Sequence, residues 1–245
     1  MPATPAWPPK SLPRLFVAHP LSDDAEVALN PAQSNYLQNV LRMTAGAQLL
    51  LFDGISGEWL ARIGASGKKR AVVSVERKIR DPEDIPDVWL AFSPVKRGQT
   101  DWLVEKATEL GAARLIPVMT DRTIPGRVRV DRLRSIAIEA AEQCGRTRVP
   151  QIDEPVPLRR FVEERNTARH LYFADESGGE PVATAFRGGP AVLFVGPEGG
   201  FTEDERVFVR GSGACAISLG PRILRAETAA LAALSAYMAL AGDWR

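Results

Sequence analysis

The sequence predicts an α/β fold: a parallel sheet with helices on both faces, preceded by a small β-rich module. Short runs rich in strand residues, joined by turn-like segments, fill the first 80 residues. From residue 88 onward, near-continuous apolar strands alternate with helices, which is typical of a parallel sheet buried on both faces. Between the two patterns, 81–87 (DPEDIPD) holds two prolines and four acids. We therefore expect a linker and a domain boundary there.

Composition excludes several classes of protein. The chain has 245 residues, of which 45% are hydrophobic and 25% charged, as in ordinary globular proteins. Its two cysteines and two histidines lack the spacing of a zinc site and fit a reducing compartment, so we expect no metal. The proline-rich start has no apolar core of a signal peptide, and the longest uncharged run is too short for a bilayer span of about 20 residues. We expect a cytoplasmic protein with no membrane segment.

The first module is expected to span 14–80, after a flexible arm at 1–13. Its strands are predicted at 14–18, 47–53, 58–64 and 71–78. One helix interrupts them: it begins at Pro31, and its apolar residues recur at helical spacing from Tyr36 to Leu41. The pattern indicates a curved β-module that carries a single helix.

The second domain is expected to span 88–245. The predicted strands lie at 88–94, 113–119, 170–175, 191–196 and 214–220, and the helices at 100–110, 131–144, after Thr202, and at 226–241. Thr202 and Glu205 have the spacing of a capping box, which marks a helix start. Ligands of such sheets bind beyond the carboxyl ends of the strands, where this chain has its richest loops.

Two loops carry the chemistry. The first, Gly196–Gly200 (GPEGG), lies between a strand and a helix start, so its backbone can approach a ligand closely. Glu198 would repel a phosphate, and the dinucleotide fingerprint is absent, so a cationic or polar ligand suits the loop better. A tight strand–helix turn without a ligand is the alternative.

The second loop, 218–228 (SLGPRILRAET), holds Arg222 and Arg225 beside a Gly-Pro turn. Arginines at a strand end are costly to bury unless they are paired. Arg225 could form an ion pair with Glu198 or Glu227 that only holds the loops together. Alternatively, one arginine is free to meet a phosphate or a nucleobase.

A third group consists of Glu139, Gln143 and Arg146, which share one helix face and could line the same opening as Arg122. A hydrogen-bonded face that supports the core is an equal alternative. Although the net charge is only +1, cations cluster at 68–70 and between Arg122 and Arg134. Such clusters favour a surface for polyanions, and a solvated surface is again the alternative.

The motifs WLVEKATELG, EAAEQCGR, GPEGGF and SLGPRILRAETA resemble those of the RsmE-type family of 16S ribosomal RNA uridine-N3 methyltransferases, of the SPOUT class. The stretches RLFV and VLRMTAGAQLLLFDG resemble that family's PUA-like RNA-binding β-barrel, so the match covers roughly residues 14–242. One departure is visible. The family often has a histidine ahead of VLR, whereas this chain reads SNYLQNVLR, with Asn35 or Asn39 nearest. No role for a histidine is expected there.

The resemblance implies a C-terminal trefoil knot that holds S-adenosylmethionine, and a homodimer with the RNA site shared between chains. The implied cofactor-binding residues are Phe173, Ala174, Gly196, Pro197, Glu198, Gly199, Leu219, Gly220, Ile223, Leu224, Arg225 and Thr228. The implied RNA-binding residues are Arg14, Arg42, Lys68, Lys69, Arg70, Arg127 and Arg129. The expected partner is 16S ribosomal RNA in the small ribosomal subunit.

Methylation of uridine N3 requires loss of the imide proton, and the negative charge that develops needs a cation. Arg225, Arg122 or Arg146 could supply it, and Glu198 or Glu227 could act as the base. Two rival functions stay open: methylation of another RNA, such as transfer RNA, and a non-catalytic RNA-binding assembly factor. A third, an unrelated nucleotide-binding α/β protein, is disfavoured by the missing phosphate fingerprint.

Overall fold

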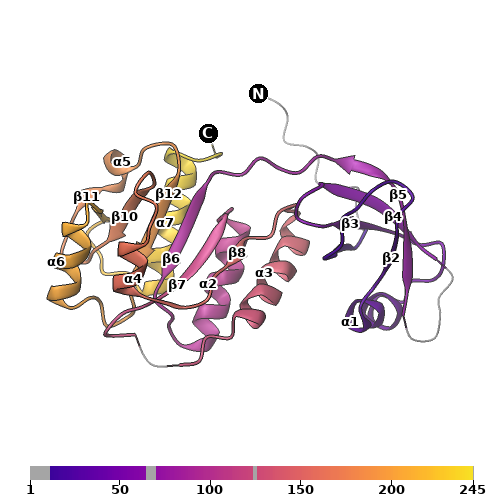
Figure 1. Ribbon diagram of the computed structural model, residues 1–245, viewed down its shortest axis with the longest axis horizontal. Coiled ribbons are helices and arrows are strands. Elements are labelled where there is room, and N and C mark those ends of the chain that lie inside the picture. The colour runs from indigo at the N-terminus through magenta and orange to yellow at the C-terminus, as the bar shows by residue number, and fades with distance from the viewer. Residues whose placement is uncertain (1–11, 65–69, 124–125, 245) are drawn as a thin grey trace. The chain divides into compact units, whose positions relative to one another are not determined.

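The computed structural model describes residues 12–64, 70–123 and 126–244 (Figure 1). Contacts divide the chain into two compact units. Unit 1 contains the residues up to Asp84 together with Ala141–Val149, and unit 2 contains the rest. The domain boundary expected at 81–87 stays a prediction. Nothing in the sequence indicated that residues 141–149 would belong to the first unit.

Unit 1 is built on a curled five-stranded sheet. Its strands, in spatial order, are β1 (Arg14–Phe16), β3 (Gln48–Phe52), β4 (Glu58–Ile63), β5 (Val72–Arg80) and β2 (Glu26–Ala28). β1 runs parallel to β3, and the other neighbours are antiparallel. The β4–β5 register shifts twice, and bulges of this kind increase the local twist of a sheet. The predicted curved β-module with one helix is confirmed, although β2 was not predicted.

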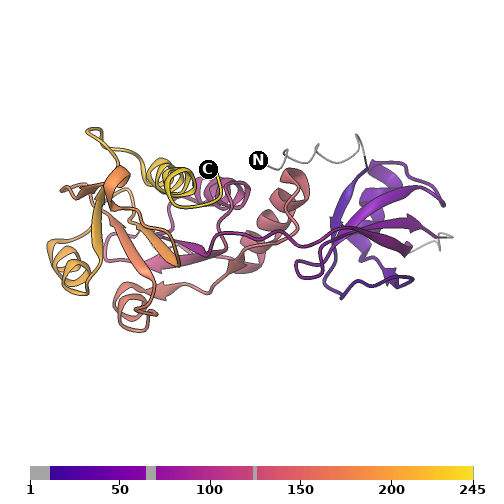
Figure 2. The same cartoon turned by 90° about the horizontal axis from the view of Figure 1, so that it is seen from above.

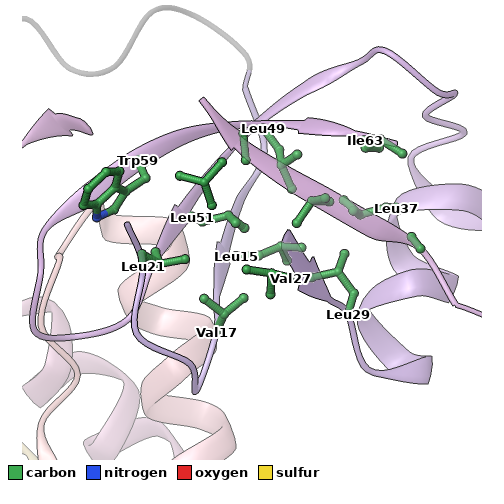
Figure 3. Packing of buried hydrophobic residues seen from close by; sticks show 14 residues of the cluster. Leu15, Val17, Leu21, Val27, Leu29, Leu37, Leu49, Leu51, Trp59 and Ile63 are labelled. Atoms are coloured by element: carbon green, nitrogen blue, oxygen red, sulfur yellow. The ribbon is translucent and has the colours of Figure 1, made fainter. Parts of the chain in front are cut away.

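The helix of unit 1 changes character along its length. It begins as α1 (Pro31–Asn35) behind a capping box between Asn30 and Gln33, and continues as the π-helical turn η1 (Tyr36–Val40). Leu37 is fully buried and joins the apolar cluster of the sheet. Figure 3 shows Leu37 with the side chains of Leu15, Val27 and Leu49, which come from different strands and point toward one another. This cluster holds the helix against the sheet.

A buried arginine ties the two chain segments of unit 1 together. Arg14 is 7% exposed, and its Nε lies 2.6 Å from a carboxylate oxygen of Glu58. The guanidinium also donates to three backbone carbonyl oxygens in the segment 141–146, at 2.7–2.8 Å. The other oxygen of Glu58 accepts from Arg80 at 3.0 Å. The expectation that Arg14 contacts RNA is therefore corrected, because burial and these bonds leave its guanidinium no access to a ligand.

Unit 2 is built on a parallel sheet, as predicted. Its spatial order is β11 (Glu180–Pro181), β13 (Cys215–Ser218), β10 (His170–Ala174), β12 (Ala191–Val195), β6 (Val88–Phe92), β7 (Arg114–Met119) and β8 (Gln151–Ile152), and β9 (Val156–Pro157) pairs with β7. Every recorded pairing between these strands is parallel. The core strands are buried on both faces, which explains their near-continuous apolar sequences.

Helices cover both faces of this sheet. They are α2 (Arg97–Glu109), α3 (Val130–Cys144), α4 (Leu158–Glu163), α5 (Val182–Ala185), α6 (Glu203–Gly211) and α7 (Ala226–Leu240). Figures 1 and 2 show α2 and α7 side by side on one face, and α4 and α6 on the other. The helices before and after β13, α6 and α7, therefore lie on opposite faces of the sheet. Among the described residues, no helix is long and apolar enough to cross a membrane.

Candidate functional site

Three loops meet at one edge of the parallel sheet of unit 2. β10, β12 and β13 are neighbours, with β10 between the other two, and each is followed directly by a loop. Because these strands are parallel, their carboxyl ends lie at the same edge. The loops enclose a cavity of about 430 Å³. Its walls are formed by residues 174–176 and 178 after β10, 195–201 after β12, 217–225 after β13, and Ala226 and Ala229 of α7.

Ten of the twelve residues predicted to bind a cofactor line this cavity. They are Ala174, Gly196, Pro197, Glu198, Gly199, Leu219, Gly220, Ile223, Leu224 and Arg225. Phe173 lies instead in the core, fully buried, with its ring centroid 4.7 Å from that of Phe201. Thr228 is exposed on the first turn of α7 and does not line the cavity. The predicted loops therefore come together, and their binding role stays a proposal.

The GPEGG loop is a tight turn whose shape requires its glycines. The Gly200 amide donates to the Pro197 carbonyl oxygen at 2.9 Å, and Gly200 has a φ of 66°. A Cβ at Gly200 would be strained at this φ and would require the carboxylate of Glu176 to move, so glycine is favoured there. On the outer side, Arg122 donates to the carbonyl oxygen of Gly199 at 2.9 Å. Arg122 thus braces the loop beside the cavity.

The base of the same loop is fixed to the aromatic core. A Cβ at Gly196 would lie only 2.5 Å from the ring of Phe201, so this glycine lets the ring pack beneath the loop. Phe201 is 1% exposed and makes edge-to-face contacts with Phe173 and Phe194. Substitution of Gly196 is therefore expected to disturb the core as well as the cavity.

Two arginines of α6 hold the wall that follows β10. The side chain of Asp175 is fully buried, and it accepts from Arg206 at 3.3 Å and from Arg210 at 2.8 Å. Arg206 also pairs with Glu176, a second lining residue. Burial alone would raise the pKa of Asp175, but hydrogen bonds from Ser177 and Arg210 outweigh it and hold the pKa below its ordinary value. The carboxylate is thus ionised and fixed in place.

The loop after β13 has exposed side chains at the opening of the cavity. Ile223 is 90% exposed, and Arg222 and Arg225 are exposed and line the cavity. Within the part of the chain that the structure describes, neither guanidinium makes a hydrogen bond or an ion pair. Arg225 occupies the N-cap position of α7. Of the two alternatives for this loop, the geometry favours the one in which an arginine is available to a ligand.

Glu227 does not form the ion pair with Arg225 that was considered as one alternative. It is 8% exposed and accepts a hydrogen bond from Gln99 of α2 at 3.3 Å. Glu198, at the tip of the GPEGG turn, is exposed and lines the cavity. Of the two carboxylates considered as a base, Glu198 is therefore the one that faces the cavity.

The third predicted group is not gathered at the cavity. Arg146 is 6% exposed in unit 1, where its Nε lies 3.4 Å from a carboxylate oxygen of Glu83. Its expected catalytic role is corrected, because it is buried in a unit that does not contain the cavity. Glu139 and Gln143 are exposed on α3. Arg122 alone reaches the loops, through Gly199.

The residues predicted to bind RNA are distributed over both units. Arg42 and Arg70 are exposed in unit 1, and Arg127 and Arg129 are exposed in unit 2. Lys68 and Lys69 lie outside the described residues.

Sequence reasoning missed Arg206 and Arg210, although their spacing of four on a predicted helix could have indicated a shared carboxylate partner.

The fold and the cavity define an RNA methyltransferase domain joined to a PUA domain. The family model described as RNA methyltransferase domain matches residues 82–238, and the one described as RNA methyltransferase PUA domain matches residues 29–76. A ribosomal RNA small subunit methyltransferase E of Synechocystis is 35% identical over 93% of this chain and 77% of its own length. The chain belongs to the ribosomal RNA small subunit methyltransferase E family.

Two solved structures agree with this assignment. The ribosomal RNA small subunit methyltransferase E of Neisseria gonorrhoeae, bound to S-adenosylmethionine, is 32% identical with a TM-score of 0.86, over 96% of this chain and 100% of that one. A Legionella pneumophila methyltransferase in complex with S-adenosylmethionine is also 32% identical, with a TM-score of 0.88 over 95% and 99% of the two chains.

Proposed function

We propose that this chain transfers a methyl group from S-adenosylmethionine to N3 of a uridine in 16S ribosomal RNA, in the cytoplasm. The observation that carries the proposal is the single cavity formed by the loops after β10, β12 and β13. Family membership supports the reaction and the class of RNA, and two related structures have S-adenosylmethionine bound. The position of the methyl group on the uridine comes from the sequence resemblance.

The lining of the cavity fits S-adenosylmethionine. Val195, Phe201, Ile217, Leu219 and Leu224 offer apolar surface suited to a flat purine. Glu198 offers negative charge to the cationic parts of the molecule, and Arg222 at the opening can meet its carboxylate. When bound, S-adenosylmethionine supplies an electrophilic methyl group on a sulfonium centre.

The chain's own residues would then bind, orient and neutralise the uracil. Arg225 is exposed at the opening with no partner among the described residues, so it can stabilise the negative charge that spreads over N3 and the uracil oxygens. Glu198 also lines the cavity and can accept the imide proton. Holding the two reactants in line supplies much of the acceleration in such transfers.

Three further features belong to this proposal. The loops after β10, β12 and β13, which meet at one cavity, would form the trefoil knot that the sequence resemblance implies, with the cofactor held in it. The exposed Arg127 and Arg129 would hold the RNA backbone, and that contribution would weaken with added salt. The alanine-rich helix α7 would contribute to a homodimer interface, because small residues permit close approach.

Cofactor binding is tested by a substitution that fills the cavity with a larger side chain on helix α7, rather than by one in a glycine turn. Ala229 lines the cavity and lies on α7, so Ala229→Phe adds a ring without straining a loop. We expect calorimetry to show loss of S-adenosylmethionine binding. The matched variant Ala239→Phe lies on the exposed end of α7 and should bind as the wild type does.

The reaction itself is tested by mass mapping of small-subunit RNA after incubation with protein and isotopically labelled S-adenosylmethionine. The expected product is one methylated uridine whose added mass sits on the base.

Two kinds of result would contradict the proposal. Wild-type S-adenosylmethionine affinity in Ala229→Phe would exclude this cavity as the cofactor site. Labelling of transfer RNA alone would move the proposal to a different substrate, and absence of transfer with intact binding would favour an assembly factor.

A further inference from the structure

The helix of unit 1 presents an unusual outward surface. We define this outer face as Asn35, Tyr36, Asn39, Val40, Leu41 and Arg42, all of which are exposed. Tyr36 is 42% exposed, Val40 61% and Leu41 38%. Packing in the core does not explain why three large apolar side chains are exposed on so short a helical segment.

Packing fixes the helix through its other side. Leu37 is fully buried in the cluster shown in Figure 3. The Ser34 hydroxyl accepts from the Ala71 amide at 3.1 Å, and the Gln33 carboxamide donates to the Phe16 carbonyl oxygen at 2.6 Å. The outer face is therefore held on a rigid support, with its side chains turned toward solvent.

The backbone beneath the outer face is unusual. The Leu41 amide donates to the Tyr36 carbonyl oxygen at 2.9 Å, a bond of the π type that aligns residues 36 and 41 along the helix. Arg42 follows with a φ of 53°, in the left-handed region that non-glycine residues rarely adopt. π-turns and left-handed residues of this kind cost stability and concentrate at functional sites.

The charge and chemistry of the outer face suit a nucleic acid. From residue 27 to residue 52 the chain contains one arginine and no acid, so this stretch itself brings no carboxylate to the outer face. Arg42 makes no hydrogen bond or ion pair with any described residue. Asn39 donates to Asn35 at 2.7 Å, so a pair of carboxamides is exposed on the same short segment as Tyr36. Aromatic rings, cations and carboxamides are the groups that proteins use to read unpaired bases.

We propose that the outer face binds an unpaired nucleobase of the RNA substrate, stacked on Tyr36 and flanked by Val40, with Arg42 at the adjoining phosphate. This inference rests on the proposed function only in taking RNA as the substrate. It names a second contact with the RNA, in unit 1, and a preference for single strands over duplexes. A paired base cannot offer its face to a side chain without first being unstacked.

The test uses the full-length protein and two labelled RNAs, a uridine-rich 12-nucleotide single strand and a hairpin that places the same sequence in a duplex. Fluorescence anisotropy measures their affinities. We expect wild type to prefer the single strand, and Tyr36→Ala to weaken that binding by about tenfold. Tyr36→Phe keeps the ring and should bind as wild type. Arg42→Gly removes the charge, relieves the left-handed strain, and should reduce the salt dependence of binding.

The matched control is Ile55→Ala, because Ile55 is 77% exposed in the turn between β3 and β4 and lies outside the outer face. It should bind both RNAs as wild type does. Val40→Ser gives a second variant at an exposed site if Tyr36→Ala does not fold. Unchanged single-strand affinity in the folded Tyr36 and Val40 variants would overturn the proposal, and so would equal binding of the two RNAs by wild type.

Failure of the proposed function gives a different pattern. Calorimetry with S-adenosylmethionine should give the same affinity for Tyr36→Ala and wild type, because the cofactor cavity lies in unit 2. If wild type binds no S-adenosylmethionine yet loses single-strand affinity in Tyr36→Ala, the proposed reaction fails and the outer face stands. If self-association, rather than RNA binding, is lost in Tyr36→Ala, the outer face is a protein contact and the inference is wrong.

Discussion

Among single residues, Arg225 has the most direct part in the proposed chemistry. Its guanidinium is exposed at the cavity and has no partner among the described residues, so it is available to an anionic uracil. We expect Arg225→Ala to lower kcat by about 10²–10³, the range for loss of one charge-stabilising group. S-adenosylmethionine affinity should change far less. Steady-state kinetics and calorimetry separate the two effects.

The matched control for this prediction is Arg160→Ala, since Arg160 is an exposed arginine of α4 that pairs with Glu164 and does not line the cavity. Arg225→Lys should recover only part of the rate, because an ammonium lacks the planar fork of a guanidinium. An unchanged kcat in Arg225→Ala would remove this residue from the mechanism.

The residues of the cavity could be predicted from sequence where they lie in loops, and less well elsewhere. Strand ends and glycine turns placed the GPEGG and LGPRILR loops correctly, because the position of a loop follows from the order of the elements. Phe173 and Ala174 were both predicted, but only Ala174 reaches the cavity, since side chains alternate along a strand and Phe173 points into the core. Arg146 was misplaced because helical spacing reveals a shared face, not the unit against which it packs.

At the scale of elements, the attachment of α6 to the end of β10 makes stability depend on pH. Asp175 is held by Arg206 and Arg210, and its pKa in the folded protein lies below its ordinary value. Ionised Asp175 therefore stabilises the fold at pH values above its unfolded pKa, and this stabilisation is lost as the pH falls through the folded pKa. Asp175→Asn removes it at every pH.

We expect Asp175→Asn to cost about 1–3 kcal/mol at pH 7, since it leaves buried donors without their partner. The difference in Tm from wild type should shrink as the pH falls below about 4, the ordinary aspartate pKa, because the unfolded chain then takes up a proton that folded Asp175 binds only at lower pH. Thermal melts across that range measure it. Asp243→Asn removes the same charge from an exposed site and should show neither effect. A Tm difference independent of pH would contradict the explanation.

The long elements followed from sequence, but the short and irregular ones did not. β6, β10 and β12 carry continuous apolar runs, and α6 carries a capping box, so local signals were sufficient. β2 was missed because only one of its three residues is buried. The π-turn at Tyr36–Val40 was expected as ordinary helix, since one extra residue per turn leaves almost no trace in the spacing of apolar side chains.

For the whole molecule, the proposed homodimer makes a testable claim about α2 and α7. These helices lie side by side on one face of the sheet, and Trp102 and Leu240 remain 45% and 43% exposed on them. If this face is the dimer interface, burying such side chains drives association. We expect Trp102→Lys combined with Leu240→Lys to convert a dimer into a monomer in sedimentation velocity.

Val207→Lys provides the control, because Val207 is 63% exposed on α6, which covers the opposite face of the same sheet. It places a lysine at an equally apolar exposed position and should leave the dimer intact. A wild-type protein that sediments as a monomer at micromolar concentration would remove the dimer from the proposed function. Dissociation caused by Val207→Lys alone would move the interface to α6.

Unit 1 is assembled from two stretches of chain that are separated by more than fifty residues of unit 2. During synthesis, Arg14 and its partner Glu58 leave the ribosome seconds before the carbonyl oxygens of 141–146 become available to accept hydrogen bonds from Arg14. Until then, the first eighty residues contain the Arg14 guanidinium without most of its hydrogen-bond acceptors. For the same reason, a continuous fragment that ends at residue 84 would contain Arg14 without its carbonyl acceptors in 141–146.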